Sequence, residues 1–304
     1  MKNRHVPEIS VGIPAYNEEA NIGHLLRALL KQKEKGFLLK EVIVISDGSS
    51  DKTVSTALSV NDKRLIVLDR KDRKGQAFRQ NEILKVFKGD ILVLLNADVL
   101  PNNEFFLARI IAPFSINKKI GIVSGRGIPL SAETFFEKMI NFSTAMKEEM
   151  VEKINGGNNV YFCHGHSRAF SRAFADRFSW ADAVSEDAYS YFMCKKLGFS
   201  FHYAKDAEIV YRSPQNFNDH MKQSTRFFKG QRNLGQHVAS NIVANEHNIP
   251  YNVIITTTFK YFFKNPVLLC EYVAVLLAAK IISLGKSTIS VNWDMATSSK
   301  TLIK

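Results

Sequence analysis

Three short acidic motifs lie at points along the chain where side chains could bind a metal ion or move a proton. They are Ser46-Asp47-Gly48-Ser49-Ser50-Asp51, Asn96-Ala97-Asp98 and Ser185-Glu186-Asp187. Each follows or adjoins a run that is typical of a buried strand or a turn. Because an open α/β sheet presents its ligand-binding groups at the ends of its strands, the three motifs predict a metal-dependent site for an anionic ligand, with a catalytic base.

Asp98 is the candidate metal ligand of the second motif. A carboxylate at the end of a strand can bind Mg²⁺ or Mn²⁺ while the same ion holds two phosphate oxygens. A metal in that position would neutralise charge on a diphosphate leaving group. The alternative is that Asp98 only caps a helix before Pro101.

Asp47 and the pair Glu186-Asp187 each allow two interpretations. Asp47 follows the run EVIVIS. It could accept a hydrogen bond from a base N–H or a ribose hydroxyl, or it could simply form a turn, because Asp-Gly is a turn dipeptide. Glu186 and Asp187 open a helix after a loop. There Asp187 could remove a proton from an acceptor hydroxyl as a general base, or both acids could cap the helix.

Basic residues elsewhere could bind the charged part of such a ligand. Lys74 and Gly75 end a basic loop, and a glycine lets the backbone come close to a phosphate or a ribose. Gln223 and Arg226 share one face of a long basic helix. Arg226 could bind a diphosphate through two parallel hydrogen bonds, and Phe227 could pack the same helix onto the site.

A histidine-rich stretch, Cys163-His164-Gly165-His166, lies between the second and third acidic motifs. One cysteine and two histidines within four residues are poorly spaced for zinc. We therefore interpret the stretch as a loop that lines an acceptor pocket, with structural histidines as the alternative.

Strand and helix patterns alternate over the first 125 residues. Pro14 is expected to end the first strand, Asn17 or Asn21 to cap the helix that follows, and Pro101 to begin a later helix. The alternation predicts a mostly parallel, doubly wound α/β sheet. Strands are expected over residues 8–13, 41–45, 64–68, 90–95 and 120–124, and helices over 76–87, 133–153, 186–197 and 217–238.

Composition excludes some classes of function. The chain has 304 residues and a formal net charge of +12, which suits nucleic acid, an anionic membrane or a phosphorylated ligand. No nucleic-acid-binding motif is present, so nucleic acid is not an expected partner. The first strand leads into Pro14-Ala15-Tyr16-Asn17-Glu18 rather than a glycine-rich G-x-G-x-x-G turn, which argues against a dinucleotide-binding dehydrogenase. The three cysteines have no paired spacing and are expected to be reduced.

The last part of the chain is strongly apolar. Residues 251–263 are apolar and aromatic, and residues 266–284 are nearly all apolar except for Glu271 and Lys280. This region is expected to contact a membrane, either lying in the interface or spanning it once. Its basic flanks favour the anionic cytoplasmic leaflet. The alternative is a pair of helices that packs on the main domain.

Taken in order, these motifs resemble those of the family 2 glycosyltransferases, which are inverting enzymes with a GT-A fold. The resemblance covers about residues 8–234. It implies that Asp47 contacts the nucleotide base and that Lys74-Gly75 lies near the nucleotide. The first nucleotide-binding loop would contain Pro14, Ala15, Tyr16 and Glu18.

The remaining motifs resemble the catalytic motifs of that family. Asn96-Ala97-Asp98 takes the place of the DxD motif, with Asp98 as the metal ligand, and Glu186-Asp187 resembles the ED motif, with Asp187 as the base. Gln223-Ser224-Thr225-Arg226-Phe227 resembles the QxxRW motif. Two positions depart from the family pattern, since Asn96 lacks the first carboxylate and Phe227 replaces a tryptophan. The acceptor-side candidates are Gly165, His166, Glu186 and Phe227.

The resemblance implies a GT-A domain over residues 1–235 and a helical, membrane-associating region over residues 236–304. It implies metal-dependent transfer of a sugar, with inversion, from a UDP-sugar to a hydroxyl of a saccharide or lipid-linked acceptor. The expected cofactor is Mg²⁺ or Mn²⁺, and the expected location is the cytoplasmic face of the membrane. The alternatives are transfer to a polyprenyl phosphate, a non-catalytic nucleotide-sugar-binding subunit, and a lipid-surface anchor without a nucleotide site.

Overall fold

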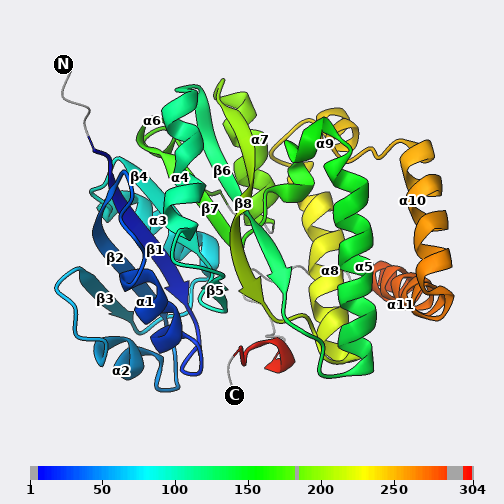
Figure 1. Cartoon of the computed structure of the whole chain (residues 1–304), viewed down its shortest axis with the longest axis horizontal. Helices are drawn as coiled ribbons and strands as arrows, with labels where there is room; N and C mark the ends of the chain where they lie inside the picture. The colour runs from blue at the N-terminus through cyan, green and yellow to red at the C-terminus, as the bar shows by residue number, and fades with distance from the viewer. Residues whose placement is uncertain (1–5, 182–184, 286–296, 303–304) are drawn as a thin grey trace.

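One eight-stranded sheet runs through the centre of the protein (Figure 1). The computed structural model describes residues 6–181, 185–285 and 297–302. It gives the backbone but not the side chains of residues 226–229, 231–232, 283–285 and 297. Across the sheet, the strands follow the order β3 (Leu65–Arg70), β2 (Leu38–Asp47), β1 (Glu8–Ala15), β4 (Ile91–Leu95), β7 (Ser167–Ser171), β6 (Ile120–Pro129), β8 (Ser200–Tyr211) and β5 (Val99–Pro101).

Two of these strands run against the others. β7 is antiparallel to both β4 and β6, and β5 is antiparallel to β8. The other pairs, β1–β2, β1–β4, β2–β3 and β6–β8, are parallel. The sheet is therefore mostly parallel, which confirms the expected α/β fold class. The carboxyl ends of β1, β2 and β4 lie at one edge, where such sheets place ligand-binding groups.

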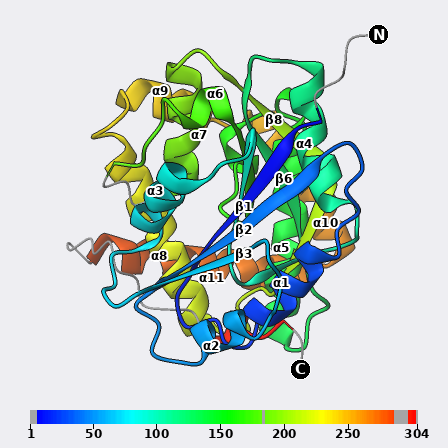
Figure 2. The ribbon, with the colours of Figure 1, turned by 90° about the vertical axis from the view of Figure 1, so that its left-hand side faces the viewer.

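Side chains that alternate along the central strands build a hydrophobic core on each face. In β4, Val93 points to the core on one face, here called the first core, whereas Leu92 and Leu94 belong to the core on the other face, the second core. Figure 2 shows α3 on one side of β1–β3 and α1 and α4 on the other. The first core lies under α1 (Ile22–Leu30), α2 (Thr53–Leu58) and α4 (Phe106–Ile116), and the second under α3 (Gln76–Val86), α5 (Phe135–Glu152), α6 (Arg172–Ala175) and α7 (Glu186–Lys196).

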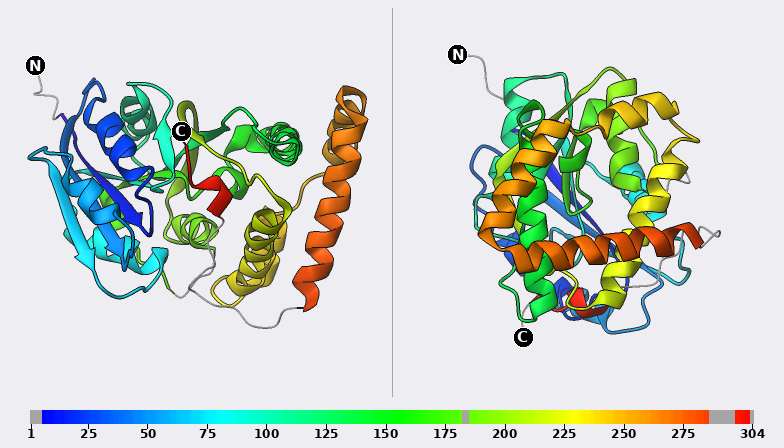
Figure 3. Two further views of the ribbon diagram at one scale, coloured as in Figure 1. Left: turned by 90° about the horizontal axis from the view of Figure 1, so that it is seen from below. Right: turned by 90° about the vertical axis from the view of Figure 1, so that its right-hand side faces the viewer.

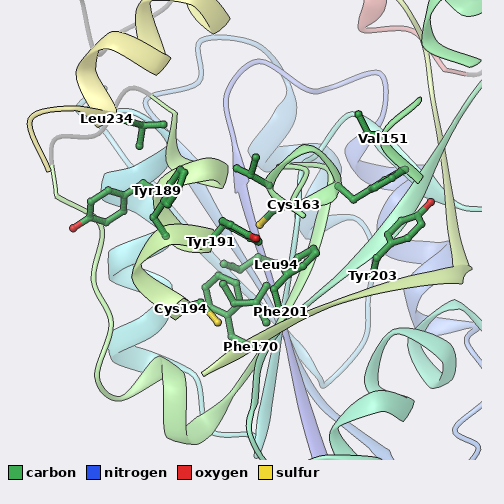
Figure 4. Close-up of a cluster of buried hydrophobic side chains, with 14 of the residues drawn as sticks. Leu94, Val151, Cys163, Phe170, Tyr189, Tyr191, Cys194, Phe201, Tyr203 and Leu234 are labelled. Carbon is green, nitrogen blue, oxygen red and sulfur yellow. The ribbon is translucent and has the colours of Figure 1, made fainter. Parts of the chain in front are cut away.

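The second core is rich in aromatic side chains (Figure 4). Phe170 of β7 stacks on Trp180, with ring centroids 5.7 Å apart, and meets Phe174 edge to face at 5.3 Å. Cys163 and Cys194 lie in this core as free, buried thiols. Since β7 and α7 both pack against this core, it fixes the side chains that those two elements present at the sheet edge.

A second layer of helices covers α5 on the side away from the sheet (Figure 3). α10 and α11 both contact α5, and α11 also contacts α8. Among the residues that the structure describes, no helix is long and apolar enough to cross a lipid bilayer. α10 (Tyr251–Lys264) and α11 (Pro266–Gly285) form this layer, and α8 (Phe217–Leu234) lies beside α5 beneath it (Figure 3). α9 (Ser240–Glu246) follows α8 in the chain, and short 3₁₀ turns lie at Asn155–Gly157, Val160–Phe162 and Thr297–Ser299.

Two prolines have roles different from those expected. Pro14 does not end β1, which continues to Ala15 alongside β2. β1 pairs with β4 only as far as Gly12, so one side of the strand is unpaired at Pro14, and a strand tolerates a residue without an N–H there. Pro101 does not begin a helix, because it ends β5, and α4 begins only at Phe106.

The sequence pattern also missed β8 and misplaced one helix cap. β8 carries Lys205 and Asp206, which interrupt its apolar alternation, and its register with β6 shifts beside them. Asn21 stands at the start of α1, but its side chain makes no capping bond. It donates instead to Glu18 Oε2 at 3.1 Å and to the carbonyl oxygen of Lys300.

Candidate active site

The second and third acidic motifs meet at Gly165. A Cβ atom added to Gly165 would lie 3.2 Å from Glu186 Oε1, 4.0 Å from Asn96 Nδ2 and 4.0 Å from Asp187 Oδ2. The antiparallel pairing of β4 with β7 explains the meeting, because it places the end of one strand beside the start of the other. At that junction the Asn96 N–H donates to the His166 carbonyl at 3.2 Å.

The first turn of α7 is held firmly. Trp180 Nε1 donates to the Glu186 carbonyl at 2.8 Å, and Arg168 Nη1 donates to the same oxygen at 3.2 Å. Asp187 Oδ1 accepts the Ala188 N–H at 2.7 Å. The other oxygen, Oδ2, is the one that faces Gly165, so the helix presents a carboxylate oxygen toward the end of β4.

Arg168 is a buried cation that the sequence did not single out. It lies in β7 with none of its surface exposed, and Nη1 also donates to Ser190 Oγ at 2.9 Å. Its guanidinium carbon lies 5.9 Å from the ring centroid of Phe170 and 5.7 Å from that of Trp180. Within the described residues, its Nε and Nη2 have no hydrogen-bond partner. Arg168 therefore supports the start of α7 from beneath.

The histidine-rich stretch lies beside the second and third acidic motifs, because it contains Gly165. Burial, together with nearby His166, lowers the pKa of His164 to about 4, so its ring is neutral at pH 7. Burial raises the pKa of Cys163 to about 12, which keeps the thiol protonated. His166 stacks on Tyr211 at 4.5 Å. Over the described part of the chain, no group of three or more histidine, cysteine or acidic side chains is arranged to hold a metal.

Asp47 organises the basic loop that follows β3. Its Oδ1 accepts the Lys74 N–H at 2.8 Å, and its Oδ2 accepts the Gly75 N–H at 2.8 Å. Arg79, which is almost fully buried, adds a bond of 2.6 Å from Nε to Oδ1. Gly75 has a φ of 91°, a conformation that favours glycine. The first acidic motif and Lys74-Gly75, which are separate in the sequence, thus form one unit.

Gln76 connects this unit to the second motif. Its Nε2 donates to Asn96 Oδ1 at 2.8 Å, while Asn96 Nδ2 faces Gly165. Asn96 stands where the DxD motif would have its first carboxylate. Its side-chain oxygen accepts a hydrogen bond from within the protein.

Glu18 and Asp98 lie close enough to interact. Burial and the neighbouring carboxylate of Asp98 raise the pKa of Glu18 to about 7, although Lys300 and Asn21 act in the opposite direction. The Glu18 N–H donates to Thr53 Oγ1 at 2.7 Å. The loop after β1 thus lies near the candidate metal ligand and is bonded to α2 through Thr53.

Tyr16 joins the same loop to the basic loop. The guanidinium of Arg73 lies over its ring, 4.0 Å from the centroid. Ala15 is buried at the end of β1, and Pro14 is partly buried beside it. The residues expected in the first nucleotide-binding loop therefore lie next to those expected near the nucleotide.

α8 reaches the third motif through a glycine. A Cβ atom added to Gly230 would lie only 1.9 Å from Ser185 Oγ, so this helix touches the residue before Glu186. Gln223 is exposed on α8. The side chains of Arg226 and Phe227 lie outside the described residues, although their backbone belongs to α8.

Comparison with known proteins finds glycosyltransferases among the relatives of this chain. The family profile described as "Glycosyl transferase family 2" matches residues 10–178. The chain is 24% identical over 271 residues to "Probable glycosyltransferase YdaM" of Bacillus subtilis, which covers 86% of this chain and 63% of that protein. It is 39% identical over 102 residues to "Dolichyl-phosphate beta-glucosyltransferase" of Drosophila melanogaster, covering 30% and 31% of the two chains. The chain thus spans less than two thirds of the length of these relatives.

A solved structure shares the fold over nearly the whole chain. The mannosyltransferase PcManGT from Pyrobaculum calidifontis, in complex with GDP-Man and Mn²⁺, superimposes with a TM-score of 0.59 at 20% identity. The match covers 95% of this chain and 78% of that one. This likeness confirms the expected GT-A-like fold.

Proposed function

This chain belongs to glycosyl transferase family 2, and on that premise we propose that it transfers a sugar with inversion from a UDP-sugar to an acceptor hydroxyl. The acceptor in this proposal is a saccharide or a lipid-linked saccharide. The observation that carries the proposal is the position of Asp187 Oδ2, which faces Gly165 beside Asn96 at the end of β4.

Asp187 is the general base in this mechanism. The Ala188 N–H holds one of its oxygens, and the other is directed toward the end of β4. Asp187 takes the proton of the acceptor hydroxyl while the acceptor oxygen attacks the anomeric carbon. The bond from that carbon to the diphosphate breaks on the opposite side, so the configuration is inverted and no covalent enzyme intermediate forms.

The donor side is formed by Glu18, Asp98 and the two loops that Asp47 and Tyr16 bring together. Asp98 would hold Mg²⁺ or Mn²⁺, because a hard cation prefers carboxylate oxygen ligands and Glu18 offers a second carboxylate nearby. A bound metal would supply positive charge to the departing diphosphate. Arg226 of α8 is the proposed second cation, with Gln223 on the same helix.

We place the protein on the cytoplasmic surface of the membrane, with α10 and α11 as the contact. Tyr251, Phe263 and Ile281 are 82%, 70% and 69% exposed on these helices. Large exposed apolar patches on a soluble surface indicate a partner. The proposed partner is an anionic bilayer surface, because Lys264 and Lys280 are exposed among the apolar residues and the acid on these helices, Glu271, is partly buried.

The proposed domain division follows from this placement. Residues 1–235 carry the catalytic motifs, and residues 236–304 carry the proposed membrane contact. One short piece of the second region is an exception, since residues 298–302 return to the loop after β1.

The test is release of nucleoside diphosphate from UDP-, GDP- and TDP-sugars with Mn²⁺ or Mg²⁺, using membrane extract as the acceptor source. We expect metal-dependent release from one donor, loss in Asp98→Ala, and a decrease of about 10²- to 10⁴-fold in Asp187→Asn. Asp176→Asn is the matched control, because Asp176 is 58% exposed. Full transfer to a hydroxyl acceptor by Asp187→Asn would contradict the proposed base.

A polyprenyl phosphate acceptor is the second candidate, favoured by the 39% identity to a dolichyl-phosphate glucosyltransferase over 102 residues. Such an acceptor is already an anion and does not need a base. Transfer to polyprenyl phosphate that survives in Asp187→Asn but not in Asp98→Ala would support it. Binding of UDP without turnover under any metal would instead indicate a non-catalytic subunit.

A further inference from the structure

The 298–302 segment returns from the helical layer to the edge of the sheet where the loop after β1 lies (Figure 1). On one side, Leu302 donates its N–H to Asn21 Oδ1 at 3.2 Å. On the other side, the Ser298 N–H donates to Asp219 Oδ2 at 2.8 Å, and Arg212 Nε donates to the Thr301 carbonyl at 2.9 Å. The segment therefore bridges the start of α1 and the start of α8.

Lys300 is the centre of this contact. Its ammonium group donates to the carbonyl oxygens of Tyr16 and Asn17, each at 2.8 Å, and to Glu18 Oε1 at 2.5 Å. An ammonium group has three N–H donors, and three consecutive residues of one loop accept them. The Lys300 side chain is only 19% exposed and that of Glu18 only 8%, so water screens the pair weakly.

The backbone of the loop has a conformation that contacts hold in place. Asn17 has a φ of 51°, in the left-handed region that glycine favours and that asparagine adopts more readily than most other residues. Its N–H donates to Ser49 Oγ at 3.1 Å, and Lys300 binds its carbonyl oxygen, so both sides of the residue are fixed. The carboxylate of Glu18 is buried, and Lys300 gives it a cation as a partner.

We propose that Lys300 is a positioning residue of the donor site, which holds the Tyr16–Glu18 loop in the conformation that receives the nucleotide. The 298–302 segment then contributes to donor binding, because it carries Lys300. This inference rests on the proposed function, because that function assigns Tyr16 and Glu18 to the nucleotide.

The test compares Lys300→Met with Lys300→Arg in the full chain, with Lys33→Met as the matched control. Lys33 pairs with Glu104 and is 58% exposed. Calorimetry measures binding of UDP with Mn²⁺, or of GDP if the wild type prefers it, and steady-state rates give KM for the donor and kcat. We expect Lys300→Met to weaken nucleotide binding and raise KM by roughly ten- to hundredfold, the effect of losing a charged hydrogen bond, with a smaller change in kcat.

Lys300→Arg should recover most of the affinity, because it restores the cation, whereas Lys33→Met should match the wild type. If the substitution only unfolded part of the protein, the apparent kcat would fall in proportion to the folded fraction, whereas KM would stay unchanged. If Lys300→Met does not fold, Lys300→Gln keeps an N–H donor without the charge on a slightly shorter side chain, and the same increase in KM is expected.

Two contrary results can be told apart. If the wild type binds nucleotide and Lys300→Met binds it equally well or more tightly, the inference is overturned and the proposed function stands. If the wild type binds no nucleotide with any metal, the proposed donor site fails and the inference fails with it.

Discussion

Asp47 accepts a hydrogen bond of 2.6 Å from Nε of Arg79, and both side chains are almost completely buried. The same carboxylate holds the Lys74 and Gly75 N–H groups, so one buried ion pair supports the whole basic loop. The pair links the end of β2 to the first turns of α3.

Arg79→Met should lower the free energy of unfolding by about 3–5 kcal/mol, because it leaves the buried Asp47 carboxylate without its cation. Urea unfolding followed by circular dichroism measures the loss. Lys71→Met is the control, since Lys71 lies on the same loop, is 88% exposed and pairs with Asp69 of β3. Equal stability of the two variants would show that the buried pair does not support the loop.

Gly165→Ala should reduce kcat by about tenfold or more while the melting temperature changes little, because small displacements at a reacting centre have large effects on rate. The new methyl group would lie 3.2 Å from Glu186 Oε1 and would force that side chain to move by a few tenths of an ångström. Steady-state kinetics and thermal unfolding on the same preparation separate the two effects. An unchanged kcat would mean that the reaction does not take place beside Gly165.

Gly230→Ala should destabilise the protein by about 1–3 kcal/mol through overpacking. The added Cβ would lie 1.9 Å from Ser185 Oγ and 3.0 Å from Ser185 Cβ. Ser185→Gly removes both atoms. In a Ser185→Gly background, Gly230→Ala should therefore cost little stability, so the double variant should be nearly as stable as Ser185→Gly alone. If Gly230→Ala lowers stability equally in the wild type and in Ser185→Gly, the cost arises within α8 and not from contact with Ser185.

The effect of Asp219 on stability should depend on pH. Burial raises the pKa of Asp219, but hydrogen bonds from Ser298 and Lys222 outweigh that effect and bring it to about 2. A lowered pKa stabilises the fold above the ordinary value near 3.9, and this stabilisation fades as the pH falls toward 2. Asp219→Asn should therefore melt below the wild type at pH 7, and the gap should narrow below about pH 4. A gap that stays constant between pH 7 and pH 3 would contradict this account.

Phe259→Ser combined with Phe263→Ser should weaken sedimentation with vesicles that contain anionic lipid. These two rings are 63% and 70% exposed on α10 and pack against each other at 4.8 Å. Ile116→Ser is the control, because Ile116 is 85% exposed at the end of α4, away from this layer. Binding should also fall with added salt, since Lys264 and Lys280 contribute through charge. Vesicle binding unaffected by the double substitution would remove α10 from the proposed contact.

The sequence predicted local features well and long-range contacts poorly. The apolar run 90–95 was enough to place Asn96-Ala97-Asp98 at the end of a strand, because a short buried run has a clear signature. No local pattern could show that β7 runs antiparallel to β4, although this pairing is what brings Gly165 to Asn96.

Arg79, Arg168 and Lys300 were missed for a related reason. Each is a basic residue in a chain that has 41 of them, and nothing in its neighbours marks it as buried. Arg79 pairs with Asp47, Arg168 donates to the first turn of α7, and Lys300 binds the loop after β1. In each case the partner is distant in the sequence. Such partners become visible only when the whole chain is folded.

The contact between Lys300 and Tyr16 also affects the order of events during synthesis. The two residues are 284 positions apart, so the ribosome makes the loop after β1 long before it makes the cation that binds it. A growing chain can pair its strands well before it can fix this loop, because contacts between distant residues form late. Nascent chains should therefore gain a folded sheet before they gain affinity for nucleotide.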